Sequence, residues 1–156
     1  MEGYKLTYHV DMVFCIDATG SMRHVLDLVK QNALNLYRDI VAEVVDYFRE
    51  RTAQLRERGV RRIVVDPGFG FAKTLEQNYE LLRGLHRLAE LGYPVLAGVS
   101  RKSMIYKLIG TTPAEALNGT TALHWECLRQ GAVILRAHDT REAVEVVRMF
   151  DQFMQA

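Results

Sequence analysis

The sequence has almost no excess of charge: 20 Lys and Arg residues stand against 19 Asp and Glu residues, a formal net charge of +1. Binding to nucleic acid or to an anionic membrane surface usually needs a basic excess, so we expect neither as a partner. The length of 156 residues predicts a single domain, 1–156. It falls well short of the roughly 250 residues of a full eight-stranded β/α barrel.

Cysteines and long hydrophobic runs are also scarce. Cys15 lies in a strand-like run and Cys127 in a helix-like run, and there are no others. Buried free thiols are therefore expected rather than a disulfide. No apolar run reaches the length that spans a bilayer, and no signal-peptide pattern opens the sequence. Together these absences favour a cytoplasmic protein.

Four short apolar runs predict buried strands. They are rich in β-branched residues and nearly continuous, as in parallel sheets covered on both faces. They occupy residues 12–16, 63–65, 95–99 and 133–135. Segments with helical periodicity separate them, so the sequence predicts an α/β fold of four parallel βα units. Either half of a TIM barrel or an open flavodoxin-like sheet fits this order.

Glycine and proline are absent from the first helical segment, residues 21–58. As one helix it would be about 57 Å long, whereas a parallel strand spans only about 17–20 Å. Either the helix breaks, near residues 35–39, or part of it projects and needs a partner. A break could be an ordinary one, or it could mark the junction of two helices from different sources.

The later helices have ordinary start signals. Thr74 is a good N-cap, Thr112 precedes Pro113 at a first helical position, and Thr140 is predicted to cap the last helix. The apolar stripe predicted for that last helix consists of Val144, Val147 and Phe150.

Charged and polar side chains follow three successive strands, at residues 66–71, 100–103 and 136–139. In βα folds the carboxyl ends of the strands meet at one rim, where ligands bind. A buried Asp66 can accept hydrogen bonds from a heterocycle, and Lys102 can donate to a ring carbonyl. Arginine and histidine suit a phosphate or another anion. The pattern therefore predicts a binding site for a pterin or phosphate type of small molecule.

Each of these residues also has a purely structural interpretation. Asp66 before a proline could form the turn, and the basic residues at 101–102 could be a solvated loop. His138 could be a satisfied structural histidine, and Asp139 could pair with Arg136. Because such groups occur at three successive strand ends, a shared binding role is favoured.

Residues 39–156 resemble the C-terminal half of dihydropteroate synthases. Five motifs carry the resemblance in the family order: VDPGFGF at 65–71, NYELL at 78–82, GVSRKS at 98–103, NGTTA at 118–122 and ILRAHD at 134–139. The resemblance implies a TIM-barrel origin and a role in folate biosynthesis. Enzymes of that family are transferases that join p-aminobenzoate to a dihydropterin pyrophosphate, with magnesium.

The resemblance implies six substrate-binding residues: Asp66, Phe71, Lys102, Ser103, Arg136 and His138. Asp66 and Lys102 would hold the pterin, and Arg136 and His138 would face the pyrophosphate. Phe71 and Ser103 would border the p-aminobenzoate pocket. The motifs of the family's N-terminal half are missing. Pterin binding without a complete catalytic site is therefore expected.

Residues 4–37 resemble a different family. The run VDMVFCIDATGSM at 10–22 looks like the opening strand and turn of a von Willebrand factor A domain. By that resemblance Asp17, Thr19 and Ser21 would ligate Mg²⁺, a hard cation that prefers oxygen. Asp17 and Ser21 could instead only cap the following helix. The two resemblances together predict a chimera, a partial dihydropteroate synthase-like protein joined to a von Willebrand factor A-like segment. A structural chimera without a selected function and a magnesium-dependent interaction module are the alternative hypotheses.

Half a barrel leaves two strand edges unpaired. A homodimer that closes eight strands would remove both edges, so we expect a homodimer.

Overall fold

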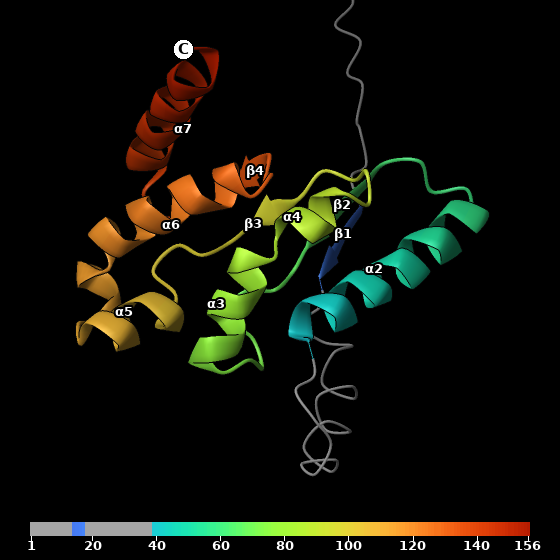
Figure 1. Cartoon of the computed structure of the whole chain (residues 1–156), viewed down its shortest axis with the longest axis horizontal. Coiled ribbons are helices and arrows are strands. Elements are labelled where there is room, and N and C mark those ends of the chain that lie inside the picture. The colour runs from blue at the N-terminus through green and yellow to red at the C-terminus, as the bar shows by residue number, and fades with distance from the viewer. Residues whose placement is uncertain (1–13, 18–38) are drawn as a thin grey trace, which may run out of the picture.

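The computed structural model describes residues 14–17 and 39–156. Its strands are β1 (Phe14–Asp17), β2 (Ile63–Asp66), β3 (Leu96–Ala97) and β4 (Ile134–Leu135). They fall where the apolar runs predicted them, although β3 and β4 are shorter than expected. Helices alternate with the strands along the chain (Figure 1). The predicted α/β class with parallel strands is confirmed.

Neighbouring strands follow the order of the chain. β1 pairs in parallel with β2, with Asp17 opposite Asp66. A parallel bridge between Val65 and Val95 connects β2 to the start of β3, and β3 pairs in parallel with β4. A flavodoxin-like sheet would place the first strand between the second and the third. That alternative is therefore wrong, and the strands follow the order of a barrel.

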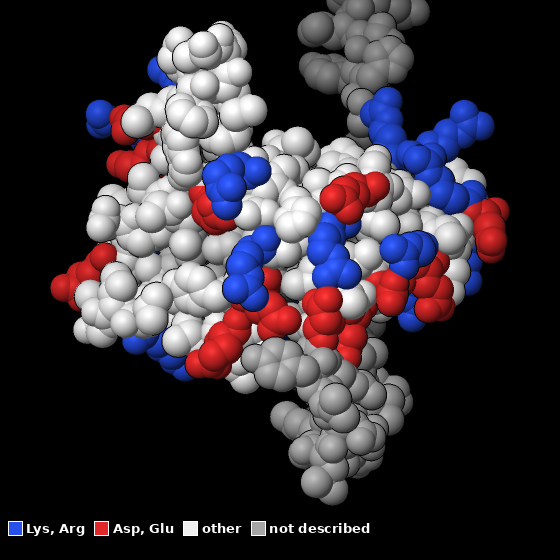
Figure 2. Space-filling model, in the orientation of Figure 1, with Lys and Arg blue, Asp and Glu red and all other residues white. Residues whose placement is uncertain are grey.

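The helices of the described residues are α2 (Ile40–Glu57), α3 (Leu75–Arg83), α4 (His86–Ala89), α5 (Ser103–Ile109), α6 (Leu117–Arg129) and α7 (Thr140–Gln155), with a 3-10 turn η1 (Pro113–Glu115). In Figure 1, α7 extends away from the other helices, and its main packing partner is α6. Figure 2 shows acidic and basic side chains beside one another over α2 and α3. Among the described residues, no helix has the length and hydropathy that a membrane span requires.

Helix α2 begins at Ile40 because Asp39 caps it. The Asp39 carboxylate accepts hydrogen bonds from the backbone N–H groups of Val41 and Ala42, each at 3.0 Å. Its other oxygen pairs with Arg87 at 2.8 Å, and this partner lowers the pKa of Asp39. The predicted break near residues 35–39 is confirmed at its C-terminal side, so residues 21–58 are not one helix.

The core lies between the strands and the helices. Its fully buried members include Val44, Phe48, Val65, Leu81, Leu85, Val95 and Ile105. Two glycines let helices approach closely. A Cβ on Gly84 of the α3 end would lie 2.6 Å from Val41 of α2, and one on Gly119 of α6 would lie 2.3 Å from Ile105 of α5.

Cys127 is a buried free thiol, as predicted. Burial raises the pKa of its thiol to about 12. Cys15 lies within β1, where only the backbone is described.

The predicted helix starts are confirmed in part. Thr74 caps α3 through a capping box with Gln77. Thr112 caps only the 3-10 turn η1, and the N-cap of α7 is Asp139 rather than Thr140. The predicted stripe of α7 is also wrong at Val144, which is 49% exposed. Because α7 packs mainly on α6, its buried face is narrow and centres on Ala143 and Val146.

Candidate functional site

Asp66, the last residue of β2, has the most buried carboxylate of the rim, with 3% of its side chain exposed. One carboxylate oxygen accepts the backbone N–H of Gly68 at 2.9 Å. The other lies 2.9 Å from Nη1 of Arg136, which follows β4. Asp66 is therefore both a turn former and one half of an ion pair that joins the ends of two strands.

Gly98 makes this ion pair sterically feasible. It follows β3, which separates β2 from β4, and a Cβ at this position would lie 2.6 Å from Nη2 of Arg136. The guanidinium therefore lies across the glycine backbone to reach Asp66. The predicted structural pairing of Arg136 with Asp139 is wrong.

Asp139 pairs with Arg101 instead. Two nitrogens of the Arg101 guanidinium bind the two Asp139 oxygens at 2.8 and 2.7 Å. The same guanidinium donates to the carbonyls of Pro113 and Ala114, both in η1. The partner lowers the pKa of Asp139 and raises that of Arg101. Arg101 is therefore a structural clamp rather than part of a solvated loop.

Ser100 holds His138. The serine Oγ lies 3.0 Å from His138 Nδ1 and accepts the backbone N–H of His138 at 3.1 Å. Ser100 is 3% exposed, whereas His138 is exposed. The imidazole is therefore held through Nδ1, while the ring itself is exposed.

Lys102 and Phe71 meet beside the Gly68–Gly70 turn. Lys102 Nζ lies 3.8 Å from the centroid of the Phe71 ring, a cation–π contact. The lysine stem runs beside Gly70, where a Cβ would lie 2.9 Å from Lys102 Cδ. Gly70 has a φ of +78°, and its N–H donates to the buried Asn78 side chain at 2.7 Å. Ser103 follows as the first residue of α5.

The expected magnesium ligands lie largely outside the described residues. Thr19 and Ser21 are not described, and of Asp17 only the backbone is, at the end of β1 opposite Asp66. That position places Asp17 at the same rim as the other strand ends. Within residues 14–17 and 39–156, no group of three His, Cys, Asp or Glu side chains is arranged to hold a metal ion.

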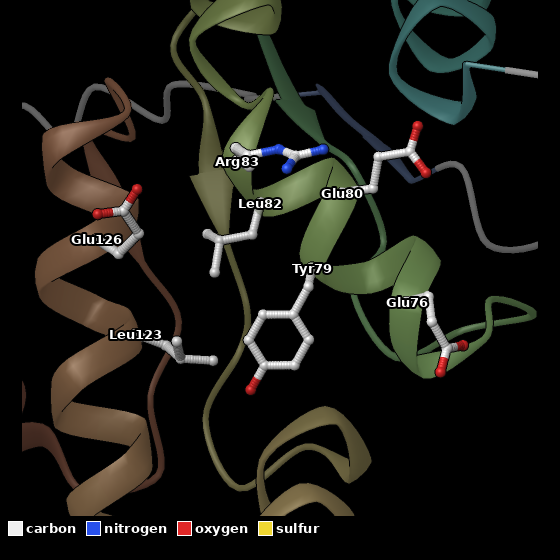
Figure 3. A pocket seen from close by; sticks show the side chains of 7 residues that line it. All are labelled: Glu76, Tyr79, Glu80, Leu82, Arg83, Leu123 and Glu126. Atoms are coloured by element: carbon white, nitrogen blue, oxygen red, sulfur yellow. The ribbon is translucent and has the colours of Figure 1, made fainter.

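A cavity of about 650 Å³ adjoins the rim at Arg136 and Ala137 and continues along α7 past Val144 to Arg148. A second hollow, of about 540 Å³, lies between α3 and α6 (Figure 3). Tyr79 and Leu82 of α3 point towards Leu123 of α6 there, and glutamates surround the opening. It is lined by none of the six predicted binding residues.

Three contributors to the rim were not identified from the sequence: Gly98, Ser100 and Arg101 as a clamp. All three belong to one motif, GVSRKS at 98–103. A glycine immediately after a strand signals a close approach by another group. The polar residues at the strand end are candidates to support neighbouring side chains, but their partners become visible only when the strand order is known.

Parallel strands in barrel order, with charged side chains at their carboxyl ends, are typical of the βα-barrel class of proteins. The family described as pterin binding enzyme matches residues 10–138. The chain belongs to that family. The match begins at residue 10, so it includes most of the segment that resembled a von Willebrand factor A domain.

The relatives in this family are dihydropteroate synthases. The chain is 41% identical over 122 residues to that of Escherichia coli strain K12, covering 77% of this chain and 43% of the relative. It is 41% identical over 135 residues to that of Neisseria meningitidis serogroup C, covering 83% and 48%. The chain therefore spans about half the length of the curated relatives that it matches.

Solved dihydropteroate synthases have the same fold in the shared part. The Yersinia pestis structure superposes with a TM-score of 0.74 at 33% identity, covering 78% of this chain and 51% of that one. The Xanthomonas albilineans enzyme, solved with 4-aminobenzoic acid, gives a TM-score of 0.72 at 40% identity and covers 80% and 46%.

Proposed function

We propose that the rim binds a reduced pterin that carries a pyrophosphate group, as part of a dihydropteroate synthase-like protein. The observation that carries the proposal is the buried Asp66, paired with Arg136 across Gly98. A carboxylate has about four lone-pair positions. The Gly68 N–H and Arg136 use two of them, so Asp66 can still accept from the ring N–H and amino groups of a pterin.

The cationic groups around Asp66 supply the complement to a pyrophosphate. Arg136 is about half exposed, with 54% of its side chain accessible, and it adjoins the cavity beside α7. Lys102 lies in the segment after β3, and His138 lies in the segment after β4, two residues beyond Arg136. Arginine binds phosphate oxygens with two parallel N–H groups, which makes it well suited to a diphosphate. Phe71 and Ser103 then border the place of the second substrate.

We propose binding without complete catalysis. Two relatives solved with ligands contain 4-aminobenzoate or 4-aminobenzoic acid, but the chain matches about half of each. Joining two substrates requires both to be held in register. A coupled assay for released pyrophosphate tests this directly: turnover above the no-enzyme rate would refute incompleteness while leaving pterin binding intact.

Calorimetric titration with 6-hydroxymethyl-7,8-dihydropterin pyrophosphate tests the binding proposal. We expect Asp66→Ala to weaken binding at least tenfold, because it removes the acceptor of the heterocycle. Asp46→Ala is the matched control, since Asp46 is an exposed carboxylate of α2 that pairs with Arg49 of the same helix. Equal affinity of the wild-type and Asp66→Ala proteins would refute the assignment of Asp66.

We include magnesium in the proposal because Asp17, the last residue of β1, lies opposite Asp66 in the sheet. Oxygen ligands at this point of the rim would place the cation beside a bound pyrophosphate. The fusion with a von Willebrand factor A segment is an alternative that rests on residues 10–22. The rim site and the von Willebrand factor A segment both predict that Mg²⁺ raises the melting temperature and that Asp17→Ala abolishes this rise. Only the rim site predicts that the rise in melting temperature grows when pyrophosphate is present.

We also propose a homodimer, because apolar side chains of β4 and α7 remain exposed. Val133, Met149 and Phe153 are each about two thirds exposed, and Ile134 is 38% exposed. A second copy would cover this surface and the free edge of β4. Light scattering tests the proposal: a folded monomer across the micromolar range refutes it, and Phe153→Glu is expected to lower the dimer fraction.

A further inference from the structure

Ser100 and His138 form a link between the ends of β3 and β4. The Ser100 Oγ lies 3.0 Å from His138 Nδ1 and 3.1 Å from the backbone nitrogen of the same residue. Ser100 is 97% buried, since only 3% of its surface is exposed. The serine therefore contacts one residue twice, through both the backbone and the side chain.

Counting donors and acceptors assigns the proton between them. A serine hydroxyl has one O–H donor and two acceptor lone pairs. The His138 backbone N–H can only donate, so it takes one lone pair. Among the described residues, the remaining hydrogen-bond partner of this hydroxyl is Nδ1. In the neutral imidazole, Nδ1 therefore accepts the serine proton, and the ring proton is on Nε2.

The same arrangement accommodates the charged imidazole. Both ring nitrogens of an imidazolium are donors. Nδ1–H can then donate to the second lone pair of the Ser100 Oγ, after the hydroxyl proton rotates away. Nε2 keeps its proton in either case. Ser100 therefore makes Nε2 a hydrogen-bond donor in both charge states of His138.

We propose that Ser100 is a positioning residue that presents the Nε2–H of His138 as a permanent donor to an anionic oxygen. This inference rests on the proposed function and specifies how the rim receives a diphosphate. His138 acts as an anion-binding donor and not as a base through Nε2. Arg136, two residues earlier, supplies the neighbouring cationic donor from the same strand end.

Nitrogen NMR of the imidazole tests the tautomer without any ligand. In ¹⁵N-labelled protein at a pH where the ring is neutral, we expect His138 to have the Nε2–H tautomer alone. Ser100→Ala removes the partner of Nδ1 and should give a mixture of both tautomers. Ser100→Thr keeps a hydroxyl and should restore the single tautomer. Thr121→Ala is the matched control, since that hydroxyl binds the Leu117 carbonyl within α6.

Inorganic pyrophosphate is the probe for binding. We expect Ser100→Ala to raise its dissociation constant about five- to tenfold, the value of one neutral hydrogen bond, and Ser100→Thr to restore affinity. An Nδ1–H tautomer in the wild-type protein, or an unchanged tautomer in Ser100→Ala, overturns the inference. Absence of pyrophosphate binding by the wild-type protein overturns the proposed anion site instead, because the tautomer measurement is made without ligand.

Discussion

Replacing Gly98 with alanine tests how the rim is assembled. The new Cβ would lie 2.6 Å from Nη2 of Arg136, whereas atoms in van der Waals contact stay about 3.5 Å apart. The guanidinium must retreat by about 1 Å, which is enough to break its 2.9 Å contact with Asp66. The three atoms nearest to the new Cβ all belong to Arg136, so its guanidinium takes the main displacement.

The expected change in stability combines two opposing effects. A hydrogen bond to a charged group contributes about 1.5–3 kcal/mol when buried, and the 54% exposure of the Arg136 side chain reduces this to about 1 kcal/mol. Replacing glycine by alanine stabilises by about 0.5 kcal/mol where the backbone allows it, through the unfolded chain. Gly98→Ala should therefore lower the free energy of unfolding by about 0.5 kcal/mol.

A double-mutant cycle with Arg136→Ala isolates the contact. In the Arg136→Ala background nothing opposes the new methyl, so Gly98→Ala should stabilise by about 0.5 kcal/mol instead. Urea unfolding of the four proteins gives a coupling energy of about 1 kcal/mol if the reasoning holds. Equal effects of Gly98→Ala in both backgrounds would refute it, because the methyl would then act on something other than Arg136.

Three further outcomes can be measured. Gly119→Ala should lower the unfolding free energy by about 1–3 kcal/mol in urea titration, because its Cβ would lie 2.3 Å from Ile105; an unchanged midpoint contradicts this. In a Cys15→Ser background, Cys127 should resist alkylation at pH 8 until the protein unfolds, since its pKa is raised to about 12; rapid labelling of folded protein contradicts this. Burial lowers the pKa of His124, so the unfolded state binds its proton first. Stability should therefore fall as the pH drops below about 6.5, the unfolded value, and His124→Gln should remove part of that dependence in urea unfolding at pH 5.5 and 7.5.

The sequence was sufficient to predict the features that depend on residues close to one another along the chain. The apolar runs located all four strands, and Thr74 was correctly predicted as the N-cap of a helix. The break before α2 could also be expected, because a 38-residue helix cannot stay packed on a short strand. Each of these depends on neighbours within a few residues.

Interactions between distant residues were not accessible in the same way. Asp139 was paired with the nearby Arg136, yet its partner is Arg101, 38 positions away. That choice depends on which strands are adjacent and on Gly98, which lets Arg136 turn towards Asp66. The buried face of α7 was also misjudged, since an apolar stripe does not reveal which neighbours cover it. Periodicity predicts a face, whereas the neighbours determine how much of it is buried.

The Arg101 clamp has a consequence for local opening of the structure. One guanidinium joins the segment after β3, the η1 turn and the N-cap of α7 through four hydrogen bonds. None of these segments can separate from the others without losing several of those bonds. Their amide protons should therefore exchange with solvent in one cooperative step with a shared opening free energy. Lysine could not replace this arginine, because a single ammonium cannot reach two chain segments and a carboxylate with the same planar geometry.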